Sequence, residues 1–185
     1  MAPDLDQAVV VALGSNLKGG FASSEALLEA ALARFPAVGL TVLARSAWWR
    51  SKASPDPAGP EYRNGVALVS TQMGPEQVLA ALLGIEAELG RHRGARNTAR
   101  TLDLDLIAHG RVMAHEPGLT LPHPRAHERL FVMGPLAEIA PCWRHPVLDA
   151  TAVELARNAA VGTDAEKMSA PEEAVRPLAG RAPRR

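Results

Sequence analysis

The sequence has little cysteine and no excess charge of either sign. Cys142 is the single cysteine among 185 residues, which excludes a disulfide framework and disfavours a zinc site built from thiolates. Twenty basic residues balance twenty acidic ones, so there is no overall attraction to nucleic acid or to anionic lipid. Any chemistry on phosphate groups must therefore rely on a local cluster of charges.

Long apolar runs are missing as well. The first apolar run, residues 8–13, follows Asp4 and Asp6, where a secretory signal would carry positive charge. No run approaches the ~20 apolar residues that span a bilayer. We therefore expect a cytoplasmic protein that does not bind membrane. We also expect a monomer whose partners are small molecules and not nucleic acid.

The chain length favours one domain, since domains commonly contain roughly 100–200 residues. We expect this domain to occupy residues 1–160. Residues 161–185 are rich in Ala, Pro, Glu and Arg without periodicity, so we expect them to form a disordered tail.

The hydrophobic pattern predicts alternating strands and helices. Expected strands lie at residues 7–16, 40–51, 61–71 and 99–110, and expected helices at residues 23–35 and 74–90. This order is that of the split βαβ unit, so the predicted fold class is α+β, a ferredoxin-like antiparallel sheet with helices packed on one face. Further along, residues 121–141 read as a Pro-bounded loop with short helical turns, and residues 151–159 as a final helix.

Two aspartates stand two residues apart on the expected fourth strand. Because side chains alternate along a strand, Leu102, Leu104 and Leu106 should face the helices, and Asp103 and Asp105 the other side. Their Cα atoms should lie about 6.5 Å apart. Two carboxylates that close repel each other, and a divalent cation such as Mg²⁺ removes that penalty. The plain alternative is a solvated polar face.

Four arginines directly precede this pair. Arg91, Arg93, Arg96 and Arg100 crowd into ten residues of a chain without net charge. The guanidinium fork suits phosphate oxygens, so the loop and the aspartates together match the needs of Mg²⁺-nucleotide chemistry. A merely solvated basic loop is the alternative.

Two further sets of side chains could bind a ligand. Tyr62 and Asn64 on the expected third strand offer a flat ring and an amide, although Tyr62 could equally be ordinary sheet packing. The segment 121–131 carries many polar groups between prolines. His123 there could be a surface residue, and its spacing from His127 says little about metal binding without a helix.

These motifs together resemble a known family. "ALGSNL", "EYRNGVAL", "GRHR…ARTLDLDL" and "LPHPRAHERLFVMGPL", in this order and at these separations, resemble 6-hydroxymethyl-7,8-dihydropterin pyrophosphokinase of folate biosynthesis over about Val9 to Leu148. The resemblance implies a ferredoxin-like fold. It also implies transfer of a pyrophosphoryl group from ATP, with Mg²⁺, to the hydroxymethyl oxygen of the pterin, with release of AMP.

The resemblance assigns roles residue by residue. Asp103 and Asp105 look like magnesium ligands, and Arg91, Arg93 and Arg100 match arginines of the catalytic loop. His123 and Arg129 match residues that touch the ATP phosphates, and Glu86 falls where the family has an acidic residue near the nucleotide. The pterin would lie between the rings of Tyr62 and Phe131, with Asn64 reading its edge.

The sequence departs from the family pattern in several places. "RNTAR" replaces a Trp-Gly-Pro before the last arginine, and Ser51-Lys52 stands where a Thr-Pro pair is common. Gly118 and Pro124 stand where some members have an arginine and a tyrosine. These departures concern loop closure and the adenine side of the nucleotide.

Two other classes are compatible with a sheet of this topology. A polymerase-palm or cyclase relative would use paired aspartates, but would not need the Tyr62, Asn64 and Phe131 set. An RNA-binding sheet would want exposed aromatic residues and a basic face, whereas two acids occupy the expected open face.

Overall fold

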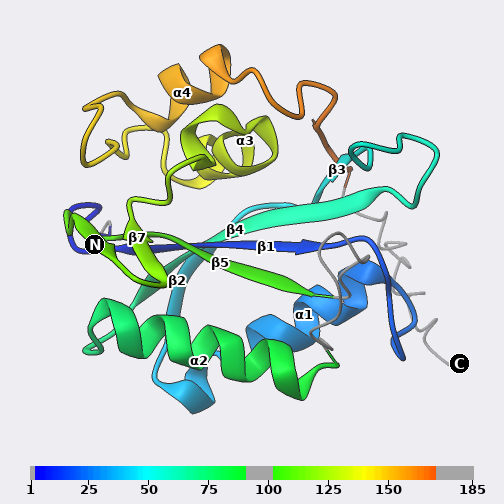
Figure 1. Ribbon diagram of the computed structural model, residues 1–185, viewed down its shortest axis with the longest axis horizontal. Coiled ribbons are helices and arrows are strands. Elements are labelled where there is room, and N and C mark those ends of the chain that lie inside the picture. The colour runs from blue at the N-terminus through cyan, green and yellow to red at the C-terminus, as the bar shows by residue number, and fades with distance from the viewer. Residues whose placement is uncertain (1–2, 91–101, 170–185) are drawn as a thin grey trace, which may run out of the picture.

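A six-stranded antiparallel sheet runs through the middle of the molecule (Figure 1). The computed structural model describes residues 3–90 and 102–169. The strands of this sheet are β1 (Val9–Ser15), β2 (Thr41–Arg45), β3 (Trp49–Ser51), β4 (Tyr62–Ser70), β5 (Asp103–His109) and β8 (Glu166–Lys167). Their order is β5-β1-β4-β3-β8, and β2 pairs with β4 as well. A separate two-stranded hairpin consists of β6 (Ala114–Glu116) and β7 (Leu119–Leu121).

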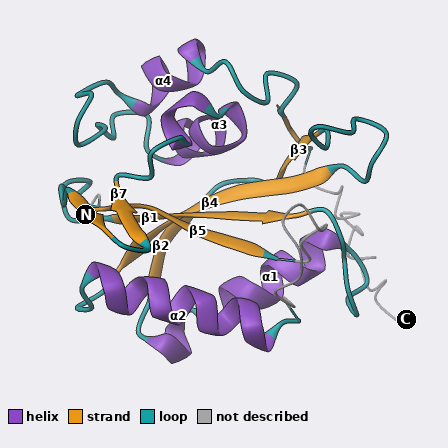
Figure 2. Cartoon of the chain, viewed as in Figure 1, coloured by secondary structure: helices purple, strands orange, loops and turns teal. Residues whose placement is uncertain are grey.

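The helices lie on both faces of this sheet (Figure 2). They are α1 (Ser24–Arg34), α2 (Pro75–Glu88), α3 (Leu130–Ile139) and α4 (Ala152–Asn158), with 3₁₀ turns at Pro36–Val38 and Ala126–Glu128. Within residues 3–90 and 102–169, none of them is long and apolar enough to cross a membrane.

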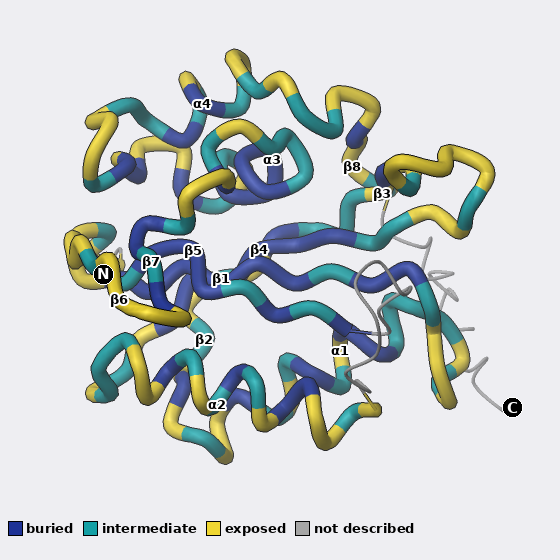
Figure 3. Tube along the Cα trace, viewed as in Figure 1, coloured by how far each residue is buried: buried dark blue, intermediate teal, exposed yellow. Residues whose placement is uncertain are grey.

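The central strands are buried on both sides, as the dark blue trace in Figure 3 shows. Val9, Val11 and Leu13 of β1 belong to one core, together with residues of α1 and α2. Val10 and Ala12 belong to a second core, together with residues of α3 and α4. The continuous apolar run of β1 is therefore the pattern of a strand covered on both faces.

The predicted final helix at residues 151–159 forms as α4, and the first two predicted helices also form where the periodicity places them. The Ser23 hydroxyl caps α1 by accepting a hydrogen bond of 3.0 Å from the Ala26 N–H. Pro75 occupies the first turn of α2, where its missing N–H costs nothing. Helices α1 and α2 pack on one face of the sheet, as expected.

The expectation that helices cover only one face is wrong. The segment 121–141, read from its prolines as a loop with short turns, contains the ten-residue helix α3. Pro135 lies inside this helix although it cannot donate a backbone hydrogen bond. Val132, Met133 and Leu136 are buried against the sheet, and this apolar packing outweighs the cost of the proline.

The expected second strand, residues 40–51, is broken into β2 and β3. At the break, the Ser46 hydroxyl accepts a hydrogen bond from the Val66 N–H, and the Ser46 N–H donates to the Val66 carbonyl. Beyond it, Trp48 packs into the α1–α2 core, while Trp49 lies against Gly134 of α3. The break therefore sends the two tryptophans to opposite faces.

Part of the expected tail belongs to the fold. The Leu130 N–H donates to the Val161 carbonyl, and β8 pairs with β3. The Lys52 N–H donates to Asp164 at 2.6 Å. A tail starting at residue 161 is thus wrong for residues 161–169, and residues 170–185 lie outside the described residues.

Candidate functional site

A row of three residues crosses three neighbouring strands, β4, β1 and β5, on the α3 face of the sheet. Asn64 of β4 pairs with Gly14 of β1, and Gly14 pairs with Asp103 of β5. A Cβ atom on Gly14 would lie 3.7 Å from Asn64 Oδ1, so the amide lies over the glycine. The sheet register thus connects the predicted edge-reading amide to the first predicted magnesium ligand.

The two aspartates project as the alternation predicts. Leu104 and Leu106 enter the core beneath α1 and α2, and Ile107 enters the core beneath α3. Asp103 and Asp105 are half-buried on the α3 side, with Asp105 opposite Ala12. Two carboxylates on one face of a rigid strand supply the hard oxygen donors that Mg²⁺ prefers.

No larger metal cluster surrounds this pair in the part of the chain that the structure describes. Groups of three or more His, Cys, Asp or Glu side chains able to hold an ion do not occur there. A pair of carboxylates leaves most coordination positions to water and to phosphate oxygens, as is usual for Mg²⁺ at nucleotide sites. The donor set of Asp103 and Asp105 therefore fits the ion that the resemblance implies.

Glu86 lies on the other side of β5. Its side chain, on α2, is only 1% exposed, and its Oε1 accepts a hydrogen bond of 2.7 Å from the Leu104 N–H. Leu104 stands between the two aspartates on the edge strand of the sheet. The described contact of Glu86 is thus with the strand that carries the aspartates.

His123 lies between the sheet and the start of α3. The backbone N–H of His123 donates a hydrogen bond of 2.8 Å to the Ile107 carbonyl, and this bond holds the residue beside β5. Burial lowers the pKa of the His123 imidazole, and the charge of Arg129 lowers it further, while Asp103 acts in the opposite direction. The fold therefore brings His123, Arg129 and Asp103 close enough for their charges to interact.

The two predicted stacking rings come from different layers. Tyr62 is the half-buried first residue of β4, and Phe131 lies in the first turn of α3. The Phe131 ring packs against Gly162, and the Arg129 guanidinium lies 5.8 Å from the ring centroid. The segment 161–169, which the sequence assigned to a tail, thus supports one of the rings.

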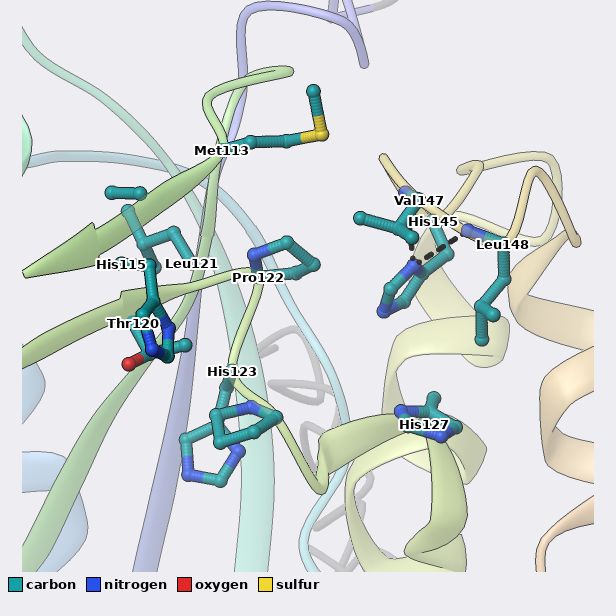
Figure 4. A pocket seen from close by; sticks show the side chains of 12 residues that line it. Met113, His115, Thr120, Leu121, Pro122, His123, His127, His145, Val147 and Leu148 are labelled. Carbon is teal, nitrogen blue, oxygen red and sulfur yellow. Dashed lines mark hydrogen bonds between the residues drawn. The ribbon is translucent and has the colours of Figure 1, made fainter.

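A cavity of about 440 Å³ lies next to His123, between the β6–β7 hairpin and the loop before α4 (Figure 4). Its lining includes Met113 and Val147. His145 is buried there, and its Nδ1 accepts hydrogen bonds from the Val147 and Leu148 N–H groups. Among the predicted site residues that the structure describes, only His123 lines this cavity.

Ser51 contacts the site although sequence reasoning did not select it. The Asn64 Nδ2 donates a hydrogen bond of 2.9 Å to the Ser51 Oγ, and both residues are 5% exposed. The available signal was the departure from the Thr-Pro pair at positions 51 and 52. The strand register that places Ser51 opposite Tyr62 could not be read from that departure.

Arg91, Arg93, Arg96 and Arg100 lie outside the described residues. Their roles in binding phosphate therefore remain predictions from the sequence.

Comparison with known proteins gives a consistent result. The profile of the family described as 7,8-dihydro-6-hydroxymethylpterin-pyrophosphokinase (HPPK) matches residues 10–141. The chain is 39% identical over 154 residues to the 2-amino-4-hydroxy-6-hydroxymethyldihydropteridine pyrophosphokinase of Synechocystis sp., covering 83% of this chain and 76% of that protein. It is 41% identical over 144 residues to the protein of the same name from Pseudomonas aeruginosa, covering 76% of this chain and 85% of that protein.

A solved structure shares the fold. The crystal structure of wild-type Plasmodium falciparum HPPK-DHPS matches with a TM-score of 0.64 at 12% identity, over 86% of this chain and 48% of that one. The chain therefore spans about half the length of that protein. At this identity the likeness shows the fold alone.

Proposed function

The chain belongs to the 7,8-dihydro-6-hydroxymethylpterin-pyrophosphokinase family, and we propose that it catalyses the reaction of this family. In that reaction a pyrophosphoryl group passes from ATP to the hydroxymethyl group of 6-hydroxymethyl-7,8-dihydropterin in folate biosynthesis. The observation that carries the proposal is the row of Asn64, Gly14 and Asp103 across three strands, because it connects a heterocycle-reading amide to a carboxylate pair.

The heterocycle would bind at the β4 end of this row. Tyr62 and Phe131 offer ring faces from the sheet and from α3, and stacked rings contribute beyond the apolar area that they bury. The Asn64 amide, 5% exposed, can pair with the polar edge of the pterin away from competing water. Gly14 has no side chain, so the space above β1 stays open. A Cβ atom there would lie 3.7 Å from Asn64 Oδ1, in van der Waals contact with the amide.

Asp103 and Asp105 would hold Mg²⁺ at the β5 end of the row. The bound ion would supply positive charge to the phosphate oxygens and favour the ionised form of the acceptor hydroxyl. Both carboxylates stand on a strand whose neighbouring side chains are buried, so their positions are fixed before substrate binds.

His123 and Arg129 would orient the phosphate chain. Burial and the charge of Arg129 lower the pKa of His123, which favours a neutral imidazole that would act by hydrogen bonding. Arg129 precedes the first turn of α3 and carries the charge that phosphate needs. Arg91, Arg93 and Arg100 would complete this set and take up charge that develops as the leaving group departs.

In the proposed step the hydroxymethyl oxygen attacks the β-phosphorus of ATP in line. The new P–O bond forms as the bond from the β-phosphorus to the oxygen of the α-phosphate breaks. The hydroxyl releases its proton and AMP leaves. The side chains of the site position the two substrates and stabilise charge, and this requires no covalent intermediate.

Three further expectations concern the fold, the cellular compartment and the oligomeric state. We read the strand order β5-β1-β4 followed by β3, with α1 and α2 on one face, as a ferredoxin-like arrangement to which α3, α4 and β8 are added. We also propose that the protein acts in the cytoplasm and as a monomer.

A direct assay tests the function. The protein is incubated with ATP, Mg²⁺ and 6-hydroxymethyl-7,8-dihydropterin, and the nucleotide products are separated. AMP should form in equal amount to the pyrophosphorylated pterin. Formation of ADP, or AMP formation that does not depend on the pterin, would contradict the proposal.

A further inference from the structure

The side chain of Asn16 carries a buried oxygen atom without a partner. Asn16 is 8% exposed, and its Oδ1 has no hydrogen-bond partner in the part of the chain that the structure describes. One other buried side-chain atom there, His127 Nδ1, also lacks a partner. A buried acceptor without a donor destabilises the folded state, so its presence in a native protein calls for an explanation.

Asn16 lies at the end of the strand that separates the two halves of the proposed site. It follows Ser15, the last residue of β1, and β1 lies between β4 and β5 in the sheet. Gly14 of this strand pairs with Asn64 on one side and with Asp103 on the other. Two residues span at most about 7 Å, so the Cα atom of Asn16 lies within that distance of the Gly14 Cα atom. Asn16 is therefore close to the path from the predicted ring-reading amide to the predicted magnesium ligands.

The turn that carries Asn16 is held by the residue before it. Ser15 is buried, and its hydroxyl donates a hydrogen bond of 3.0 Å to the Leu17 carbonyl, across Asn16. Ser15 also pairs with Arg63 of β4, whose guanidinium donates to Glu25 of α1 at 2.7 Å. The backbone on both sides of Asn16 is thus fixed without help from the Asn16 amide oxygen. A side chain on a supported backbone with a polar atom left unpaired is suited to bind a ligand.

The missing partner must be a donor, because an amide oxygen only accepts hydrogen bonds. Ionised phosphate oxygens also only accept, so the phosphate chain of ATP does not match this atom. The hydroxymethyl group of the pterin carries an O–H that can donate. In the proposed reaction this group extends from the ring at Asn64 toward the ion at Asp103, and β1 lies between these two residues.

We propose that Asn16 is a further substrate-binding residue, whose Oδ1 accepts a hydrogen bond from the hydroxymethyl O–H of the pterin. The bond orients the acceptor oxygen before the transfer. This inference rests on the proposed function for the identity of the ligand. It explains why a buried position holds an asparagine, although an apolar side chain there would leave no polar atom unpaired.

The test compares a ligand that has the hydroxyl with one that lacks it. The ligands are 6-hydroxymethyl-7,8-dihydropterin and 6-methyl-7,8-dihydropterin, and their dissociation constants are measured by fluorescence titration. Saturating Mg²⁺ and α,β-methylene-ATP are present, because this analogue cannot release AMP and no transfer follows binding. The variants are Asn16→Leu, which has a similar shape without polar atoms, and Asn16→Asp, which keeps an acceptor oxygen. Asn64→Ala serves for comparison.

The expected result is a loss of the preference for the hydroxyl without a loss of stability. Asn16→Leu should lower this preference roughly ten-fold, the value of one hydrogen bond, and should bind the 6-methyl ligand within about two-fold of wild type. Its melting temperature should be unchanged or higher, since the unpaired buried oxygen is gone. Asn16→Asp should keep the preference. Asn64→Ala should weaken both ligands equally, because the ring that Asn64 would contact is common to them.

An unchanged preference in Asn16→Leu would overturn the inference, and so would loss of the preference in Asn16→Asp. Equal weakening of both ligands in Asn16→Leu, with a lowered melting temperature, would show a structural role alone. If wild type bound neither ligand, this inference and the proposed function would both fail. If wild type binds both ligands but forms no AMP from ATP and the pterin, the proposed reaction fails, while the binding comparison still decides the role of Asn16.

Discussion

The carboxylate of Glu86 and the backbone N–H of Leu104 form a buried hydrogen bond of 2.7 Å. Leu104 separates the two aspartates, and β5, on which all three stand, has a sheet partner on one side only. An outward N–H of such an edge strand has no ladder partner, so the helix supplies one. The resemblance associates this acidic position with the nucleotide, and the described contact adds a role in holding the strand that presents Asp103 and Asp105.

Substitutions of Glu86 test whether its hydrogen bond to Leu104 or its charge stabilises the protein. Glu86→Leu leaves the Leu104 N–H buried without this acceptor and should lower the free energy of unfolding by about 1–3 kcal/mol. Glu86→Gln keeps an acceptor oxygen and should cost less. Urea unfolding measures both. Glu88→Gln, at an exposed ion pair with Arg34, is the surface control and should change little. Equal losses in the Gln and Leu variants would show that the hydrogen bond is not the cause.

Asp103→Asn and Asp105→Asn test the carboxylate pair. Each should lower kcat by roughly 10³-fold, because removing a group that stabilises charge at the reacting phosphates costs several kcal/mol. The melting temperature should not fall, since both side chains are half-buried on the site face rather than packed in a core. Asp149→Asn, at an exposed residue of the loop before α4, should keep wild-type turnover. Near-normal AMP release by either site variant would refute the metal assignment.

Gly134 tests the packing of α3 on β3. A Cβ at this position would lie 2.7 Å from the ring of Trp49, which must then move. This overlap should lower the free energy of unfolding by about 1–3 kcal/mol in Gly134→Ala. Because Trp49 pairs with Asn64, the substitution should also raise the KM of the pterin. Gly84 in α2 has no atom within 4 Å of its built Cβ. Gly84→Ala is the matched helical control and should stabilise the protein by up to about 1 kcal/mol. Equal effects of the two substitutions would contradict the packing argument.

His145 gives the stability a pH dependence of known sign. Burial lowers its pKa from 6.5 to about 4, with contributions from His127 and Arg111. Its Nδ1 already accepts two backbone N–H groups, so protonation there would break both bonds. Between these two pKa values, His145 therefore carries an extra proton in the unfolded chain but not in the folded one. The stabilising contribution is complete above pH 6.5 and is lost as the pH falls toward about 4.

The measurement is urea unfolding from about pH 7 to about pH 4.5. His145→Asn keeps an acceptor near the position of Nδ1 but cannot titrate, so its stability should fall less steeply than that of wild type. His115→Asn, at an exposed residue of β6, should follow the wild-type slope. Parallel slopes for His145→Asn and wild type would show that another group causes the dependence.

The strands and helices that the sequence predicted are those with strong local signals. The apolar run of β1 and the periodic stripe of α2 each determine an element without distant contacts. The alternation of β5 likewise places Asp103 and Asp105 on the face away from α1 and α2. The predicted residues Tyr62, Asn64, His123, Arg129 and Phe131 also reach the α3 face of the sheet, because their positions follow from neighbouring elements.

The features that sequence reasoning missed depend on long-range packing. Pro135 argues locally against a helix, and only burial against the sheet makes α3 stable there. The two residues of β8 have no pattern of their own and form a strand because β3 offers an edge. The bonds from Asn64 to Ser51 and from Leu104 to Glu86 join separate elements, and a local pattern carries no information about such pairs.

Gly162 tests whether the segment after α4 supports the substrate site. It has φ +67°, and a Cβ there would overlap the ring of Phe131. Gly162→Ala should therefore displace this ring and raise the KM of the pterin roughly ten-fold, the loss expected when a stacking contact is weakened.

Gly118, with φ +84°, has no atom within 4 Å of its built Cβ. Gly118→Ala therefore carries the same kind of backbone strain without the ring contact. Steady-state kinetics should show the KM effect in Gly162→Ala alone, with both melting temperatures lowered. If Gly118→Ala raised the KM of the pterin equally, backbone strain rather than contact with Phe131 would be responsible, and the segment 161–169 would have no part in the site.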